Sequence, residues 1–302
     1  MVALNETIRR PDETAAVLPE HGSNNATVEL RVHGLRLFPS HAATLGFALH
    51  TGETLVVLGR NGTGKSQLIN LLAGIYPVPR GVIRFGEDDA GDDLGLMRLR
   101  QRRVGVVFQQ PALLRSLSIF ENLALPLRLA HRHAPRGLGW QRRKSRAEIR
   151  DEVQHLLALV GVPHCEDLYP HELSVGNQQC VALARALAGN KRVLLCDEPT
   201  ADLSPDKAFQ IDELLAGLVR GGVLRAAVVC TQNLETAFRL GSRFLLLGDG
   251  ENLGQAEHCE DRAALRARPA FQRLLRLPSE ALFWSDDHDA RRSALGRSLH
   301  VP

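Results

Sequence analysis

The sequence lacks any apolar run approaching the roughly 20 residues that a membrane-spanning helix needs. Its N-terminus also lacks the apolar core of a secretory signal peptide. These two absences predict a cytosolic protein that reaches a membrane only through a partner. The formal net charge is +3, from 37 Lys and Arg against 34 Asp and Glu, so the balance gives no basic footprint for nucleic acid. We therefore expect no nucleic-acid partner.

Cysteine is scarce, and its spacing excludes two classes of protein. The five cysteines are an odd number and no two of them form a C-x-x-C pair. This predicts neither a disulfide framework nor a zinc site, but reduced side chains used for packing. With 302 residues, 44% hydrophobic and 24% charged, the chain has the composition of a soluble globular protein with one large or two modest domains.

One glycine-rich stretch carries a phosphate-binding pattern. Residues 59–66 fit G-x-x-x-x-G-K-[ST], with an apolar strand expected before them at 54–58 and a helix after them that stops at Gly74. Glycines let the backbone N–H groups turn inward, and a helix N-terminus favours an anion. These flanks disfavour a chance glycine turn. The predicted nucleotide-binding residues of this P-loop are Gly59, Arg60, Asn61, Gly62, Thr63, Gly64, Lys65 and Ser66.

Two of these side chains have roles that follow from their chemistry. Lys65 is expected to reach the β- and γ-phosphates of ATP, and Ser66 to place its hydroxyl on Mg²⁺.

Phe38 lies in the stretch after the first predicted strand. It either stacks on the nucleotide base or is an ordinary edge-strand aromatic, and the sequence leaves both interpretations open.

A second acidic motif fits the P-loop. Asp197 and Glu198 follow residues 192–196, of which the last four are apolar and which are predicted to form a buried strand. A carboxylate pair at the end of such a strand puts Asp197 at the metal ion and Glu198 at the attacking water, as general base. An Asp-Glu pair alone is weak evidence, whereas the preceding strand and the P-loop upstream strengthen it.

The remaining pattern predicts an α/β fold, because apolar strands alternate with amphipathic helices. Helices are expected around 153–160, at 178–188 and from Ser204-Pro205 onward. The other strands are expected at 28–32, 35–37, 46–50, 82–85, 104–108, 226–230 and 243–247.

The chain divides into three parts by composition. We expect a flexible N-terminal tail at 1–27, an ATPase domain at 28–258 with a helical subdomain at about 110–180, and a helical appendage and tail at 259–302. Residues 131–150 are rich in Arg, Lys and His. A solvated basic loop is the preferred interpretation of this stretch, and a patch for lipid headgroups or a partner is the alternative.

Over residues 28–258 the sequence resembles the ATP-binding-cassette (ABC) ATPases, because its motifs occur in the order found in that family. Gln109 sits at the family's Q-loop glutamine, 182–187 match the helix after the signature, and 197–203 match its Walker B motif and D-loop. The resemblance implies a mostly parallel core sheet, an antiparallel β edge and a helical subdomain. It makes Gln109 a ligand of Mg²⁺ and a contact to a transmembrane partner. The positions of the signature are Ser174, Val175, Gly176, Asn177 and Gln178.

Resemblance also implies that two such cassettes pair head to tail, with ATP between the P-loop of one and the signature of the other. Four positions depart from the family pattern. Val175 replaces a glycine and Asn177 a glutamine of the signature, while Ser204 replaces the D-loop aspartate. Gln232 stands at the switch histidine, where it still donates an amide N–H to the γ-phosphate but is never cationic.

The sequence thus predicts an ATP-hydrolysing subunit that energises a separate transmembrane permease from the inner face of the membrane, paired with a second cassette. Residues 116–127 resemble the stretch after the Q-loop in bacterial lipid- and lipoprotein-trafficking ATPases, which suggests lipid as cargo. The alternative is a catalytically weak or regulatory cassette in a heterodimer, on the grounds of Gln232 and Val175. A soluble ABC protein of DNA repair or translation is disfavoured by the single cassette and the near-neutral charge.

Overall fold

The computed structural model describes residues 27–275, apart from 39, 41, 80, 87, 90–102, 131–143, 190 and 249. All but the last residue of the expected tail at 1–27, most of the basic stretch 131–150 and the segment from 276 onward therefore lie outside the described residues.

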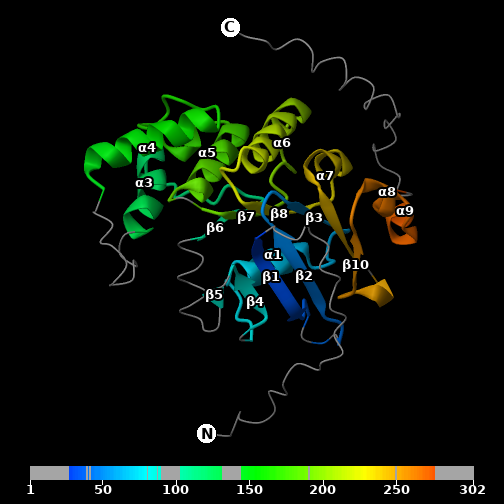
Figure 1. Ribbon diagram of the computed structural model, residues 1–302. Helices are drawn as coiled ribbons and strands as arrows, with labels where there is room; N and C mark the ends of the chain where they lie inside the picture. The colour runs from blue at the N-terminus through cyan, green and yellow to red at the C-terminus, as the bar shows by residue number, and fades with distance from the viewer. Residues whose placement is uncertain are drawn as a thin grey trace, which may run out of the picture.

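The larger sheet has six strands in the order β10-β9-β3-β8-β7-β6. All neighbours from β9 to β6 run parallel, whereas β10 pairs antiparallel with β9 at the edge. Figure 1 shows these strands crossing the middle of the molecule. The strands are β3 (Thr54–Leu58), β6 (Val104–Val107), β7 (Val193–Asp197), β8 (Ala226–Thr231), β9 (Arg243–Leu247) and β10 (Ala256–Cys259).

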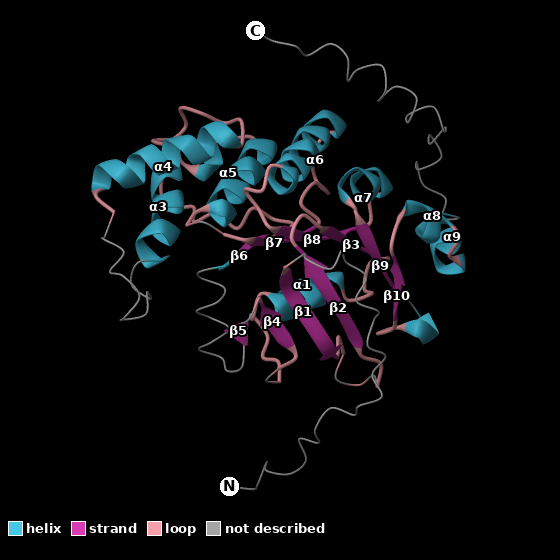
Figure 2. Cartoon of the chain, in the orientation of Figure 1, coloured by secondary structure: helices cyan, strands magenta, loops and turns pink. Residues whose placement is uncertain are grey.

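The smaller sheet is antiparallel and has the order β2-β1-β4-β5. It lies on one side of α1 (Lys65–Leu72), with the larger sheet on the other, as Figure 2 shows. Its strands are β1 (Val28–Leu35), β2 (Leu45–His50), β4 (Ile83–Phe85) and β5 (Asp88–Asp89).

The other helices gather on the face of the larger sheet that is away from α1. Helices α3, α4 and α5 lie together beyond β6, α6 and α7 follow along the same face, and α8 and α9 lie near β10 (Figure 1). The helices are α3 (Ile119–Ala130), α4 (Arg146–Leu159), α5 (Val175–Leu187), α6 (Pro205–Arg220), α7 (Leu234–Leu240), α8 (Arg262–Arg266) and α9 (Pro269–Leu275), with short 3₁₀ turns η1 (Pro170–Glu172) and η2 (Gly250–Asn252).

Strand β3 explains why the core has two layers. All five of its residues are buried, and alternate side chains point to opposite faces of the sheet. Val56 joins the apolar cluster under α3–α7, while Leu55 and Val57 join the cluster around α1 between the two sheets. A run of apolar residues without polar alternation is typical of a parallel strand covered on both faces.

The C-terminal helices also contribute to the first apolar layer. Leu265 of α8 and Phe271 of α9 are 0% and 1% exposed and belong to the cluster under α3–α7. The ring of Phe271 meets that of Phe238 on α7 edge to face, with 6.0 Å between centroids.

The predicted fold class is confirmed: an α/β fold with a mostly parallel core sheet, an antiparallel β edge and a helical region. The expected start of α5 at Gln178 was wrong, because the helix begins at Val175, where the Ser174 hydroxyl caps it by accepting the N–H of Asn177 at 3.2 Å. Ser204 does precede α6, but its side chain makes no capping hydrogen bond. All five cysteines are reduced and buried. Within the described part of the chain, no helix is both long and apolar enough to cross a bilayer.

Candidate functional site

The loop 59–64 connects β3 to α1 and requires glycine at two points. Gly62 and Gly64 have φ angles of +82° and +101°, in the left-handed region that side chains rarely adopt. Gly59 has a different constraint, because a Cβ there would lie 2.5 Å from the Oγ1 atom of Thr63. That hydroxyl in turn donates to the carbonyl oxygen of Arg60 at 2.8 Å, so the loop is closed on itself.

The main chain of the loop holds the side chain of Lys65 in place. Its ammonium Nζ donates to the carbonyl oxygens of Gly59 at 2.8 Å and Arg60 at 3.1 Å, and the side chain is only 6% exposed. The buried thiol of Cys230 on β8 donates to the Lys65 carbonyl at 3.6 Å, which ties the start of α1 to the neighbouring strand. The loop thus carries a fixed positive charge beside the N-terminus of a helix, an arrangement suited to an anion.

Phe38 lies directly beside the loop. Its ring atoms are 3.1 and 3.2 Å from the position that a Cβ of Gly64 would take. The same side chain is partly buried and packs against the apolar cluster between the two sheets. Phe38 lies in a bend beyond β1, which ends at Leu35 and has β2 and β4 on its two sides, so the edge-strand interpretation is wrong, and a stacking role stays a proposal.

Asp197 and Glu198 stand at the carboxyl end of β7, next to β8. The Oδ1 atom of Asp197 is buried and accepts no hydrogen bond from any described residue. Glu198 has φ +46°, a left-handed conformation that costs a non-glycine residue free energy. Its N–H donates to the carbonyl oxygen of Cys230 at 2.9 Å, which fixes the turn after β7 to the neighbouring strand.

The Glu198 carboxylate is shared between two loops. Its Oε1 atom lies 3.4 Å from the ammonium of Lys65, and its Oε2 atom accepts the backbone N–H of Gln232 at 3.2 Å. Burial raises the pKa of this carboxyl above its ordinary value, while Lys65, the Gln232 N–H and the Thr231 hydroxyl act in the opposite direction. A carboxylate with a raised pKa is a stronger base, which suits it to take a proton from water.

Three of the remaining predicted residues have exposed side chains. Ser66 is the second residue of α1, Gln109 follows β6, and Gln232 follows β8, and all three are exposed. The signature stretch lies on the first turn of α5, where Val175 is 55% exposed and Gly176 is covered by the stem of Lys207. The Gln178 amide donates to the Leu173 carbonyl oxygen at 3.0 Å, so that side chain closes the turn before the helix.

The ABC transporter family matches residues 43–201, which is more than half of the chain and includes the P-loop and the Asp197-Glu198 pair. The chain belongs to this family. Among curated relatives, the sulfate/thiosulfate import ATP-binding protein CysA of Bordetella bronchiseptica is 36% identical over 78% of this chain and 65% of its own length. The methionine import ATP-binding protein MetN of Caulobacter vibrioides is 38% identical over 70% of this chain and 60% of its own. The chain thus spans a little under two thirds of the length of these relatives.

Solved ABC structures share the same fold. A dimeric post-hydrolysis state of the ATP-binding cassette MJ0796, bound to ADP and Pi, matches with a TM-score of 0.64 and 26% identity over 76% of this chain and 98% of that chain. CbiO1 from Clostridium perfringens, part of the ABC transporter complex CbiONQ, matches with a TM-score of 0.66 and 25% identity over 83% of this chain and 96% of that chain.

The oxygen atoms near the end of β7 in this ABC cassette fit a magnesium ion. Mg²⁺ is a hard cation that is usually held by one or two protein oxygens together with water and substrate phosphates. The buried, unpaired Oδ1 of Asp197 and the exposed hydroxyl of Ser66 are such oxygens, and the Gln109 side chain is exposed at the end of the adjacent strand β6. No three His, Cys, Asp or Glu side chains gather into a metal site in the described ranges.

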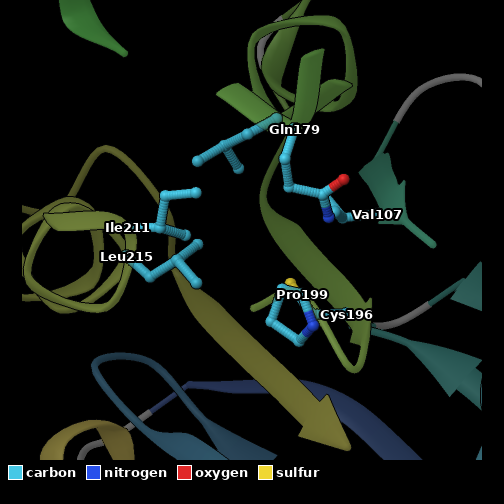
Figure 3. Close-up of a pocket in the computed structure, with 7 residues that line it drawn as sticks. Val107, Gln179, Cys196, Pro199, Ile211 and Leu215 are labelled. Carbon is cyan, nitrogen blue, oxygen red and sulfur yellow. The ribbon is translucent and has the colours of Figure 1, made fainter. Parts of the chain in front are cut away.

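Sequence reasoning missed two features of the cassette. Gln179, inside α5, donates from its Nε2 atom to the carbonyl oxygen of Phe108 at 3.1 Å, and thereby holds the residue before Gln109. The second feature is Asp212 on α6, whose carboxylate is completely buried. Figure 3 shows a small, mostly apolar pocket lined by Val107, Gln179, Leu183, Cys196, Pro199, Ile211 and Leu215.

Proposed function

We propose that this chain is the ATP-binding and ATP-hydrolysing subunit of an ABC transporter, and that it energises a separate transmembrane permease. The observation that carries the proposal is the position of the Glu198 carboxylate, 3.4 Å from the P-loop ammonium of Lys65 and bonded to the backbone of Gln232. A base, a phosphate-binding cation and a phosphate-facing amide are thereby gathered where the γ-phosphate of a nucleotide in the P-loop would lie.

In the proposed reaction, water attacks the γ-phosphorus and the bond from that phosphorus to the oxygen of ADP breaks. Glu198 takes the proton of the attacking water. Lys65 and the loop N–H groups hold the phosphates, and Gln232 donates its side-chain amide to the γ-phosphate as charge builds there. Ser66, Asp197 and Gln109 would hold Mg²⁺, which would supply neutralising charge when bound.

The signature supports a head-to-tail pairing with a second cassette, identical or different. The Ser174 hydroxyl caps α5 by accepting the N–H of Asn177, and the two preceding N–H groups, of Val175 and Gly176, would bind an anion from a partner. Val175 is 55% exposed beside them, which suits a side chain that a partner covers in the complex. In this arrangement the chain lies on the inner face of the membrane and is held there by the permease.

For cargo, we propose import of a small polar solute. The relatives named above are sulfate/thiosulfate and methionine import proteins. They give no support to the lipid cargo suggested by residues 116–127. In such a transporter the permease, not the ATPase, contacts the solute.

The test is to copurify the full chain with its permease, reconstitute both in liposomes, and measure phosphate release together with uptake of labelled sulfate, labelled methionine or a fluorescent phospholipid. We expect ATP-dependent phosphate release and uptake of a small solute. Phospholipid movement would overturn the cargo proposal. ATP binding without phosphate release, in a complex that contains a second and active cassette, would favour the regulatory alternative.

A further inference from the structure

A chain of buried polar side chains joins α6, α7 and the turn after Glu198. Asp212 on α6 is 0% exposed, and its Oδ2 atom accepts from the Thr236 hydroxyl at 2.9 Å and from the Arg239 guanidinium at 2.7 Å. The Thr236 oxygen lies 3.3 Å from the hydroxyl of Thr200, which is also buried. Among the described residues, no side-chain hydrogen bond joins Asp212, Thr236, Arg239 or Thr200 to a residue proposed to bind the nucleotide.

The direction of the hydrogen bonds follows from counting protons. The single proton of the Thr236 hydroxyl goes to the carboxylate of Asp212, which has none to give when ionised. Thr236 can therefore only accept from Thr200, so the chain runs in one direction from Thr200 to Asp212. A carboxylate that anchors such a chain fixes the orientation of each hydroxyl in it.

The far end of the chain is also fixed. Arg239, the second donor to Asp212, lies with its guanidinium 4.6 Å from the centre of the Phe209 ring. This stacking, together with the ion pair, holds α7 against α6. The carboxylate therefore has a rigid cation on one side and the threonine chain on the other.

The two threonines lie on the loops that carry the proposed base and the proposed phosphate sensor. Thr200 is two residues after Glu198, in a turn closed by the N–H of Ala201 donating to the Glu198 carbonyl at 3.3 Å. Thr236 is in the first turn of α7, whose cap Asn233 directly follows Gln232. The hydroxyl contact between the threonines is thus a second link between the two loops, besides the backbone contact from Gln232 to Glu198.

We propose that Asp212, acting through Thr236 and Thr200, sets the relative position of the loops that carry the base and the phosphate sensor. Asp212, Thr200 and Thr236 are positioning residues, since they act through Glu198 and Gln232. The inference rests on the proposed ATPase function for its kinetic consequence, but its structural consequence is independent of hydrolysis.

The test replaces Thr236 by Val, which keeps the shape and removes the hydroxyl, and by Ser, which keeps the hydroxyl. With the permease present, we expect Thr236→Val to lower kcat for ATP about ten- to a hundredfold, since small displacements of catalytic groups have effects of this size. KM for ATP should change little and Thr236→Ser should recover most of the rate. Thr54→Val makes the same chemical change in a buried residue at the opposite end of β3, and should leave kcat unchanged.

The second readout is hydrogen exchange of the Gln232 amide, which needs no hydrolysis. That amide is bonded to Glu198, so it should exchange faster in Thr236→Val than in the native chain and recover in Thr236→Ser. If the native chain hydrolyses ATP and Thr236→Val matches it in both rate and exchange, this inference is wrong. If the native chain releases no phosphate, the proposed function fails, and the exchange comparison alone decides the positioning role. A loss in Thr236→Val that Ser does not reverse would also overturn it.

Discussion

The backbone N–H of Gln232 holds the carboxylate of Glu198, with 3.2 Å between the nitrogen and Oε2. This contact does not depend on the side chain at position 232. The main chain of that loop therefore orients the proposed base, while the exposed side chain is available for a phosphate. The side chain of Gln232, predicted to stand where the family has a histidine, therefore bears only on the proposed phosphate contact and not on the position of Glu198.

Substitutions of Gln232 should consequently change the rate without displacing Glu198. Gln232→Ala removes a donor to the transition state, and losing such a donor costs about 10²–10³ in rate. Gln232→His should raise the rate above that of the native chain. Steady-state phosphate release by the three proteins, each with the permease, checks this. Equal rates for all three would mean that the side chain does not contact the phosphate.

Glu198→Gln keeps the size of the side chain and removes its basicity. We expect turnover to fall by about 10²–10⁴, while ATP still binds and a trapped dimer accumulates on size-exclusion chromatography. Glu213→Gln makes the same change at a partly exposed position on α6 and should leave turnover unchanged. Hydrolysis at the native rate by Glu198→Gln would assign the base to another residue.

Lys65→Ala should abolish ATP binding, because it removes the cation that the loop carbonyls of Gly59 and Arg60 hold in place. Binding of a fluorescent ATP analogue measures the loss, and circular dichroism checks that the fold persists. Retained affinity together with retained hydrolysis would show that residues 59–66 do not bind the nucleotide.

Asp212 should make stability depend on pH in an unusual direction. Burial raises the pKa of Asp212 to about 6, although Thr236, Arg239 and their hydrogen bonds lower it. The folded state then binds the proton more tightly than the unfolded chain, whose value is near 3.8. This contribution to the free energy of unfolding is therefore largest at low pH, and it is lost as pH rises through about 6.

Asp212→Asn cannot titrate and so lacks this dependence. Between about pH 4 and about pH 7, the native chain should lose on the order of 2 kcal/mol of unfolding free energy relative to the variant. Urea unfolding of both proteins across this range measures the difference.

Two other titratable groups lie near Asp212. Glu213 acts to raise the pKa of Asp212, and burial raises the pKa of the Cys196 thiol, which therefore stays protonated. A difference that stays constant with pH would contradict the expectation.

Two glycines offer a matched pair for stability. A Cβ on Gly105 of β6 would lie 2.2 Å from the Ala186 carbonyl oxygen on α5, so Gly105→Ala should force the helix off the sheet and cost about 1–3 kcal/mol. Gly217 on α6 has open space around it, and Gly217→Ala should stabilise the helix by about 0.5–1 kcal/mol. Thermal unfolding of both variants compares them, and equal effects would mean that β6 and α5 adjust freely.

Local patterns were enough to predict the P-loop, the buried strands and the acidic pair, because each depends on residues adjacent in sequence. The start of α5 was missed because Val175, Gly176 and Asn177 are poor helix formers, and only the cap from Ser174 shows that they are helical. Strand β10 was missed because residues 256–259, Ala-Glu-His-Cys, have little apolar alternation, and the strand exists through its pairing with β9.

The contacts that complete the site could not be predicted from the sequence. Gln232 reaches Glu198 because β7 and β8 run parallel with Asp197 opposite Cys230, and no local pattern sets that register. Asp212 has the same difficulty, since a carboxylate on an amphipathic helix ordinarily faces solvent. Its burial depends on how α7 packs against α6, which is a property of the tertiary fold.

The edge-to-face contact between Phe271 and Phe238 bears on where this protein can be divided. The nucleotide motifs all lie before residue 233, and the family match ends at 201, yet the apolar layer beneath α7 extends to Phe271. The helix that directly follows Gln232 is thus shielded from water by side chains almost forty residues further along. A fragment trimmed to these motifs would keep every residue proposed to contact ATP and would lose part of the apolar layer that packs against α7.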